Sequence, residues 1–183
     1  TMLSCFADVS LPDNIALKAK ASASSYNEAH PPQCANDNVI RQKYYRSDYG
    51  KAWLTESNPT MPVWLHLEWE EEVAVGEIQY YGATVHHQDR NLKAYELYID
   101  NQKEPIKTGE FIRRHGPQRI VFDTPVRCRK ISFKFLSHFG HQEPGAAEIV
   151  VFSRALTDEE LTKQKEGIYY QIRRSQASKD LKQ

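Results

Sequence analysis

The sequence predicts an all-β protein, an antiparallel jelly-roll β-sandwich, followed by one C-terminal α-helix. Several short segments alternate apolar and polar residues with a period of two, the pattern of half-buried strands. Turn-rich breaks separate them, among them EAHPPQCANDN, TESNPTMP, IDNQKEP and FGHQEPG. Because no helical pattern intervenes between these strands, a sandwich or jelly roll is favoured over an α/β fold.

The strands follow from four alternating runs. Their apolar members are, in chain order, Val63, Leu65, Leu67 and Trp69, then Tyr95, Leu97 and Ile99, then Ile131, Phe133 and Phe135, and finally Ile149 and Val151. The acidic run EWEEE (Glu68 to Glu72) is expected to form a solvated turn.

The pattern changes after Ser153, where the sequence predicts a helix over residues 158–172. Thr157 and Glu160 form a capping-box pattern at its start. Three apolar residues fall near one helical face: Leu161, Ile168 and Ile172. We therefore divide the chain into a β-sandwich over residues 1–153 and a helix with a polar tail over residues 154–183.

Composition excludes several classes of protein. The 183 residues suffice for one domain with a sizeable core, and 24 basic residues balance 24 acidic ones. A chain without net charge has no overall field to hold a polyanion, which argues against nucleic acid as the main partner. No apolar run is long enough to span a membrane, and the opening TMLSCFADVS lacks the pattern of a signal peptide. The three cysteines fit no zinc template, and a bridge between Cys5 and Cys34 stays open.

Several segments, taken in order, resemble the discoidin domains, also called coagulation factor type C domains. These segments are NIALKAKASASS, ANDN, YRS, VWLHLEWEEEVAVGEIQYYG, DRNLKAYELYID, RKISFKF and GAAEIVVF. They extend over residues 10–153, and their order carries the resemblance because no single segment is specific. The resemblance implies a galactose-binding-like jelly roll, in agreement with the strand pattern. The family 32 type carbohydrate-binding modules fit with fewer conflicts than the blood-clotting branch.

Three features depart from the family pattern. Asn38 stands where a glycine is usual, although asparagine also tolerates left-handed backbone. Tyr45 stands where a tryptophan is usual. No cysteine follows Cys128, so the family's disulfide between the two ends of the domain is not available.

The resemblance also implies a calcium site. In the family, one ion commonly ties the turn near ANDN to the segment near the end of the domain, which here means Asp37 and Glu148. Backbone oxygens are then expected from Cys34, Asn36 or Ala147. Calcium prefers about six to eight oxygen ligands, which carboxylates and carbonyls supply. On the residues alone, Asp37 is equally a turn former and Glu148 a sheet-surface acid.

The segment VHHQDRN (Val85 to Asn91) lies between two predicted strands, in a loop at one end of the sandwich. A sugar pocket needs planar donors for hydroxyl pairs and an aromatic face for the ring. The candidate ligand-binding residues in this loop are His86, His87, Gln88 and Arg90. Candidates from other breaks are Tyr49, Trp53, Phe139 and His141. The resemblance agrees, since carbohydrate-binding relatives typically use histidine, arginine, asparagine and aromatic residues from these loops.

Other interpretations of these loops stay open. The histidine-rich segment is alternatively a solvated loop in which Asp89 pairs with Arg90. A transition-metal site is less favoured, because adjacent histidines in an extended strand point to opposite faces. Arg113, Arg114 and His115 form a basic spot that either meets a sulfated or acidic sugar or is simply solvated.

Three classes of function remain. The first is a non-catalytic carbohydrate-binding module, attached to or cooperating with a glycan-degrading enzyme and located outside the cell or in the periplasm. The second is a small jelly-roll polysaccharide lyase or glycosidase, and the third a protein-interaction or adhesion domain. The chain lacks Gly-x-Ser-x-Gly, His-Glu-x-x-His and a glycine-rich phosphate loop, and shows no convincing acid pair on one strand face. A lyase with His86 or Tyr49 as its base is not excluded, but the binding module is favoured.

Overall fold

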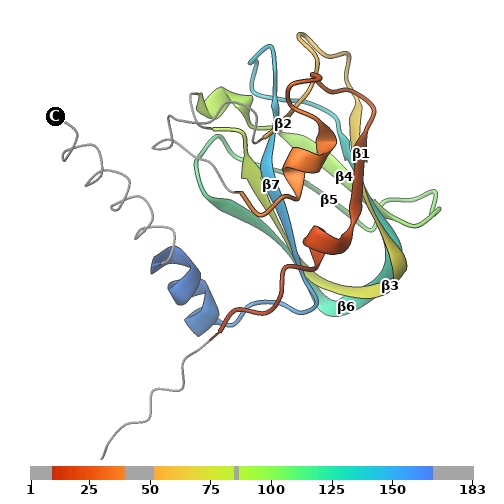
Figure 1. The fold of residues 1–183 in the computed structure, drawn as a ribbon, viewed down its shortest axis with the longest axis vertical. Helices are drawn as coiled ribbons and strands as arrows, with labels where there is room; N and C mark the ends of the chain where they lie inside the picture. The colour runs from red at the N-terminus through yellow and green to blue at the C-terminus, as the bar shows by residue number, and fades with distance from the viewer. Residues whose placement is uncertain (1–9, 40–51, 85–86, 167–183) are drawn as a thin grey trace, which may run out of the picture.

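The computed structural model describes residues 10–39, 52–84 and 87–166 (Figure 1). The strands are β1 (Lys20–Ala23), β2 (Trp53–Leu54), β3 (Val63–Gly82), β4 (Ala94–Ile99), β5 (Lys107–Glu110), β6 (Pro117–Phe135) and β7 (Gly145–Phe152). Short 3-10 helices are η1 (Ile15–Lys18), η2 (Pro32–Ala35) and η3 (Gln88–Arg90). An α-helix over residues 158–166 follows β7.

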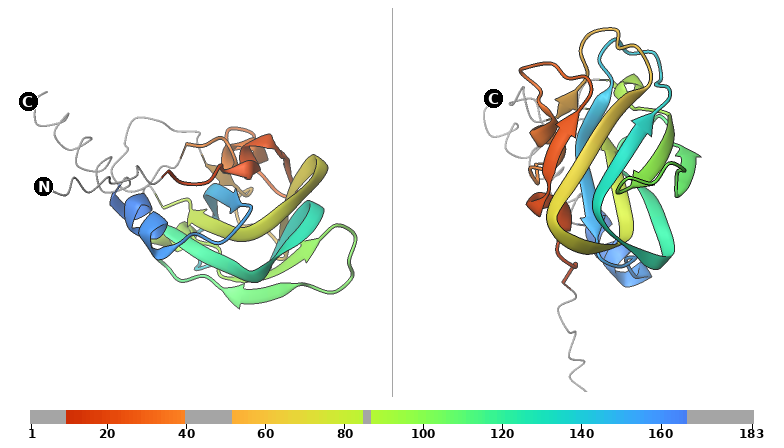
Figure 2. Two further views of the ribbon diagram at one scale, coloured as in Figure 1. Left: turned by 90° about the horizontal axis from the view of Figure 1, so that it is seen from below. Right: turned by 90° about the vertical axis from the view of Figure 1, so that its right-hand side faces the viewer.

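Two long bent strands build the sandwich. Residues 63–68 of β3 pair with β1 and with residues 130–135 of β6, and β4 and β5 extend this layer. Residues 73–82 of β3 pair with the first half of β6 and with β7, which carries β2 at its edge. All pairings are antiparallel, and both long strands curve from one layer into the other (Figure 2).

The acidic run EWEEE lies at this bend. Glu68 to Glu72 stay in strand conformation while the β3–β6 ladder shifts its register there, so the expectation of a turn is wrong. The four glutamates are exposed as their charge demands, and only Trp69 of the run is buried. The strand continues because β6 bends beside it, with Arg127 Nε 2.6 Å from Glu72 Oε1 across the pair.

The predicted core is confirmed. The alternating apolar residues are all buried: Val63, Leu65, Leu67, Trp69, Tyr95, Leu97, Ile99, Ile131, Phe133, Phe135, Ile149 and Val151. Aromatic rings stack at its centre, with Phe133 and Phe135 centroids 5.3 Å apart and Tyr80 4.2 Å from Phe111. Full burial of each such side chain contributes roughly 1.5–3 kcal/mol.

β7 is buried on both faces, which alternation alone does not predict. One face enters the main core, and the other belongs to a second apolar cluster that includes Tyr81, Val150 and Phe152. Leu156 and Leu161 from the C-terminal segment cover this cluster. These two leucines thereby cover part of the outer face of β7.

The start of the C-terminal helix confirms the capping box. Thr157 N–H donates to Glu160 Oε2 at 2.8 Å, and Glu160 N–H donates to Thr157 Oγ1 at 3.2 Å. Arg154 adds two bonds to the same carboxylate, at 2.9 and 2.7 Å. Ile168 and Ile172 lie outside the described residues, so their packing stays a prediction.

A buried polar network fixes the segment before the helix. Glu77 is fully buried and receives bonds from Arg119 at 2.7 and 2.8 Å and from Leu156 N–H at 2.8 Å. Burial would raise the pKa of Glu77, but these bonds and one from Gln79 hold it below its usual value. A buried carboxylate paired in this way ties β3, β6 and the C-terminal segment together.

The structure bears on the expectations for the cysteines and for a membrane-spanning segment. Cys128 is buried, and burial raises the pKa of its thiol to about 11, whereas Cys5 lies outside the described residues and its bridge to Cys34 stays a prediction. Within the described part of the chain, no helix has the length and apolarity needed to cross a membrane.

Candidate functional site

The bends in β3 and β6 bring several loops to one end of the sandwich. Hydrogen bonds join the loop before β4 to the β6–β7 loop (residues 136–144): Phe139 N–H donates to Asn91 O at 3.4 Å, and Lys93 N–H to Ser137 O at 2.8 Å. The β2–β3 loop joins them through Asn58 N–H and Gln142 O, 2.7 Å apart. Segments distant in sequence therefore share one surface.

Arg90, at the end of η3, lies at the centre of this surface. Its Nε is 3.4 Å from both ring nitrogens of His141, and its Nη2 is 3.4 Å from Glu143 Oε2. The His87 ring lies 5.2 Å from the His141 ring, centroid to centroid. The structure thus brings together three of the predicted residues, while the partner of Arg90 is Glu143 and not Asp89.

Glu143 is the residue that the sequence reasoning missed. Besides Arg90, its carboxylate accepts from Asn27 Nδ2 at 3.4 Å and from Ser57 Oγ at 3.3 Å. It therefore links four loops. Its position in the turn-rich segment FGHQEPG gave no signal, because an acid in a loop is ordinary.

The site keeps His141 neutral. Burial lowers the pKa of His141, and the nearby Arg90 charge lowers it further. Its Nδ1 accepts a hydrogen bond from Glu143 N–H at 3.0 Å, which requires an unprotonated nitrogen. The two causes agree, so His141 serves as an acceptor at neutral pH.

Asn91 holds two of the loops of this site together. This fully buried side chain donates through Nδ2 to Gln88 O at 2.8 Å and to Arg114 O at 3.0 Å. It thereby fixes η3 and the β5–β6 loop (residues 111–116) in one arrangement. A Cβ at Gly82 would lie 1.9 Å from Asn91 Oδ1, so only glycine leaves room for this anchor.

The aromatic side chains considered for ligand stacking differ in exposure and position. Phe139 is half-buried at the site, with Lys93 Nζ 5.9 Å from its ring centroid. Tyr26, beside Asn27, is 49% exposed and was not predicted. Trp53 is wrong as a ligand-stacking face, because pairing of β2 with β7 turns its ring into the core. There it lies 6.0 Å from the Phe135 ring and donates to Ser25 O at 3.0 Å.

The remaining predicted ligand residues are placed as follows. His87 and Gln88 are exposed on the rim of the site. His86 and Tyr49 lie outside the described residues, so their roles stay predictions. The shared surface consequently comprises His87, Gln88, Arg90, Phe139, His141 and Glu143.

A second polar site lies where the turn at Asp37 meets β7. Glu148 is fully buried, accepts from Asn38 N–H at 3.2 Å through Oε1, and its Oε2 has no hydrogen-bond partner among the described residues. Burial raises its pKa to about 9, and the neighbouring Asp37 carboxylate adds to this. Asn38 adopts φ 62°, which confirms that asparagine supplies the left-handed turn.

The residues at this second site fit a hard cation. Two carboxylates meet, and one buried oxygen lacks a donor, a costly arrangement that a positive ion relieves. Asn36 and Ala147, the sequence neighbours of Asp37 and Glu148, are buried, and Cys34 lies in η2. The side chain of Asn36 donates through Nδ2 to Ala16 O and to Ala19 O, both at 2.8 Å. Within the described residues, no three His, Cys, Asp or Glu side chains are grouped to hold a metal. Backbone oxygens would therefore have to complete the site.

Comparison with known proteins agrees with this architecture. Residues 18–150 match the F5/8 type C domain. The family 32 carbohydrate-binding module of Clostridium perfringens NanJ, solved with galactose, superposes with a TM-score of 0.65 at 20% identity, covering 77% of this chain and 98% of that one. A fucose-binding module of Streptococcus pneumoniae gives 0.61 at 21% identity, covering 78% and 96%. No curated protein matches the sequence. The match over residues 18–150 shows that the chain belongs to the F5/8 type C domain family.

Proposed function

We propose that this domain is a non-catalytic glycan-binding module whose ligand site is the loop surface around Arg90. One observation carries the proposal: Arg90, His141 and Glu143 form a connected polar cluster at the loop end of the sandwich, where the half-buried Phe139 is joined by its backbone to Asn91, next to Arg90. Planar donors and acceptors next to an aromatic face are the elements of sugar recognition.

The cluster retains donors for a ligand. The bonds of Arg90 to His141 and Glu143 use Nε and Nη2 and leave Nη1 without a partner among the described residues. A guanidinium held on one side by protein groups presents its other edge in fixed orientation to two hydroxyl oxygens. The side chain of Arg90 is 19% exposed, so part of it is accessible to a bound sugar.

Similar solved structures support a saccharide as the ligand class. Two modules of Clostridium perfringens were solved with galactose and with GalNAc-β-1,3-galactose, and the lectin domain of lectinolysin with Lewis b. The glycan proposed for this chain comes from that class, and we expect a dissociation constant of about 0.1–1 mM. A location outside the cell or in the periplasm, and attachment to or cooperation with a glycan-degrading enzyme, are parts of the same proposal.

Substitution of Arg90 tests the site. On a glycan array followed by titration calorimetry, Arg90→Ala should lose measurable binding, because the variant lacks the guanidinium fork that is proposed to hold two hydroxyl oxygens. Arg127→Ala is the matched control, since Arg127 also pairs with a carboxylate, Glu72, but at the bend of β3 and β6. Full affinity in Arg90→Ala, or turnover of a polysaccharide by the wild-type domain, would refute the proposal.

We also propose that calcium binds between Asp37 and Glu148 as a structural ion. When bound, it would supply positive charge to the two carboxylates and join the turn before residue 40 to β7. These residues are separate from the Arg90 cluster in the sequence and in their hydrogen bonds, so the ion has no direct part in ligand recognition. Calcium should raise the melting temperature of the wild-type domain, and an unchanged melting temperature between chelator and millimolar calcium would contradict this.

A further inference from the structure

The β5–β6 loop beside the Arg90 cluster carries two exposed arginines. Arg113 forms no hydrogen bond or ion pair with the described residues, and Arg114 donates only to Pro117 O, at 2.7 Å. The described ion pairs all involve other residues, and Glu110, just before the loop, pairs with neither arginine. No described carboxylate therefore compensates the two positive charges of this loop.

This loop is held rigidly. Gln118 clamps it by accepting from Ile112 N–H at 2.7 Å and donating to Ile112 O at 2.8 Å. On the other side, Arg114 O accepts from Asn91 Nδ2 at 3.0 Å, and His115 Nδ1 lies 2.7 Å from Thr84 Oγ1. A solvated loop would need no such clamps, and a preorganised one loses little entropy when it binds.

The clamps connect the arginines directly to the proposed site. Asn91, which holds Arg114 O, also holds Gln88 O of η3 and accepts from Phe139 N–H. Lys93 bridges the same two regions, because it accepts from Phe111 N–H at 2.9 Å and places Nζ 5.9 Å from the Phe139 ring centroid. The loop therefore lies next to the ligand surface and not elsewhere on the sandwich.

The charges are distributed unevenly around this surface. At the centre, Arg90 is paired with Glu143. Three basic residues at the flank have no carboxylate partner among the described residues: Arg113, Arg114 and Lys93. Asp89 of η3 is next to Arg90 in the sequence but does not pair with it. The whole chain has a formal net charge of zero, so this excess of positive charge is local.

We propose that the β5–β6 loop forms a subsite for an anionic group of the glycan, a sulfate or a carboxylate, next to the sugar ring held at Arg90. This inference rests on the proposed function and specifies its ligand as an acidic glycan. Arg113 and Arg114 supply the charge-assisted donors, and Ile112 of the same loop, 58% exposed, offers the ligand an apolar contact. Because the arginines are exposed, their contribution is modest and falls with added salt.

A glycan array with matched triplets tests the subsite. Each neutral galactose-, fucose- or N-acetylglucosamine-terminated glycan is compared with its sulfated form and with its sialylated or uronate form. The wild-type domain should bind at least one anionic form about 5- to 20-fold more tightly than its neutral parent, and raising the salt should reduce only that preference. Preference for the sulfated or for the carboxylated form identifies the source of the charge.

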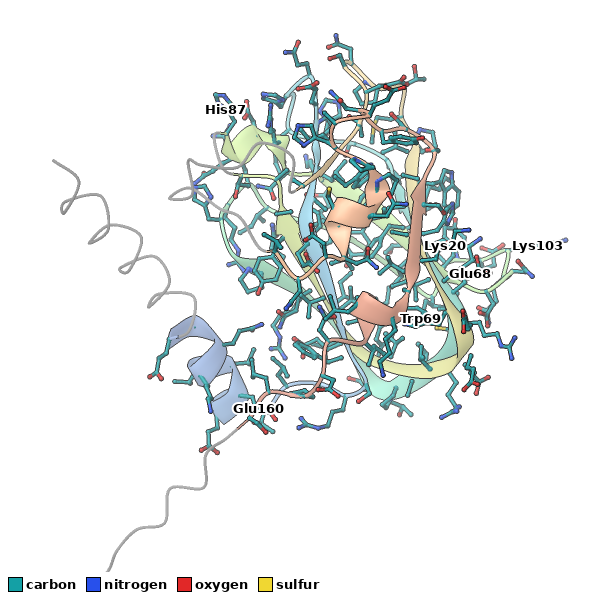
Figure 3. The ribbon with its side chains drawn as sticks, in the orientation of Figure 1. Lys20, Glu68, Trp69, His87, Lys103 and Glu160 are labelled. Carbon is teal, nitrogen blue, oxygen red and sulfur yellow. The ribbon has the colours of Figure 1, made fainter. Side chains whose placement is uncertain are left out.

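Variants then locate the preference. Arg113→Ser with Arg114→Ser should remove it while leaving affinity for the neutral parent within about twofold. Arg113→Ser alone, which breaks no bond among the described residues, should lower it partway. Lys103→Ser with Arg129→Ser removes two exposed charges elsewhere and should change nothing; Lys103 lies far from His87 in Figure 3.

The outcomes separate the two proposals. Equal affinity for neutral and anionic glycans, or an anionic preference that survives the arginine double variant, overturns the subsite while the Arg90 site stands. Binding that is insensitive to Arg90→Ala, or no glycan bound at all, overturns the proposed function and the subsite with it.

Discussion

Glu148→Gln should stabilise the cation-free domain, although it removes a residue proposed to bind calcium. The pKa of Glu148 is about 9 in the folded protein, against 4.5 for the ordinary group. The protonated carboxyl therefore favours folding below about pH 4.5, and this advantage is lost as the pH rises towards 9. At pH 7 the unfolded chain carries the ionised acid and the folded one the protonated acid, a penalty of about 3 kcal/mol on folding.

Glutamine keeps the shape and removes this penalty. Its Oε1 can still accept from Asn38 N–H, and its amide can donate to the Asp37 carboxylate without taking up a proton, as the wild-type acid must. For a domain of this size, about 3 kcal/mol corresponds to a rise in melting temperature of roughly 6–12 °C. The variant should also lose the calcium effect, because one of the two carboxylates is gone.

Thermal unfolding with chelator and with calcium, at pH 5 and pH 8, checks both parts. In chelator, the wild-type melting temperature should fall between pH 5 and pH 8 relative to Glu148→Gln. Calcium at about 100 times its dissociation constant should restore roughly 2.7 kcal/mol to the wild type and nothing to the variant. Glu71→Gln, at an exposed position of the bend, is the matched control and should behave as wild type. The reasoning fails if wild type and Glu148→Gln show parallel pH profiles, or if calcium shifts both equally.

Three further predictions follow from the site and the helix. Gly82→Ala should lower stability by about 1–3 kcal/mol and weaken glycan binding, because the new Cβ displaces Asn91; unaltered melting and affinity would contradict this. Thr157→Ala should cost about 0.5–2 kcal/mol through the lost cap on Glu160 N–H and leave glycan affinity unchanged, which denaturant titration and calorimetry measure together. Glycan affinity should fall only below pH 6.5, because burial and the Arg90 charge lower the pKa of His141. Protonation of His141 would place a second positive charge beside Arg90 and remove an acceptor. Affinity already lost at pH 7 would count against His141 as a neutral acceptor.

The sequence determined the local elements of this protein and their order. Alternation marked the core residues of β3, β4, β6 and β7 because successive side chains of a strand face opposite sides, and burial reaches only one side of most strands. The capping box marked the start of the helix because its two bonds lie within one turn. The order of these segments also indicated the family. Asparagine at position 38 indicated a left-handed backbone conformation, which the structure has.

Tertiary structure decided everything that depends on long-range pairing. The bend of β3 beside β6 replaced the turn expected at Glu68 to Glu72, since a neighbouring strand can satisfy a curved backbone that no local pattern describes. Pairing of β2 with β7 buried Trp53, although its place in a break suggested an exposed ring. The outer face of β7 is buried because Leu156 and Leu161 return to cover it.

The candidate site shows the same division. The sequence indicated the loop of Arg90 and the break of His141 as separate candidates, because loops with clustered polar and aromatic residues are recognisable one at a time. That Glu143 joins them, and that the β5–β6 arginines stand beside them, depends on contacts between residues more than twenty positions apart. Such contacts come from the antiparallel register of the two bent strands, which brings four loops to one end and which the pattern within any single segment does not contain.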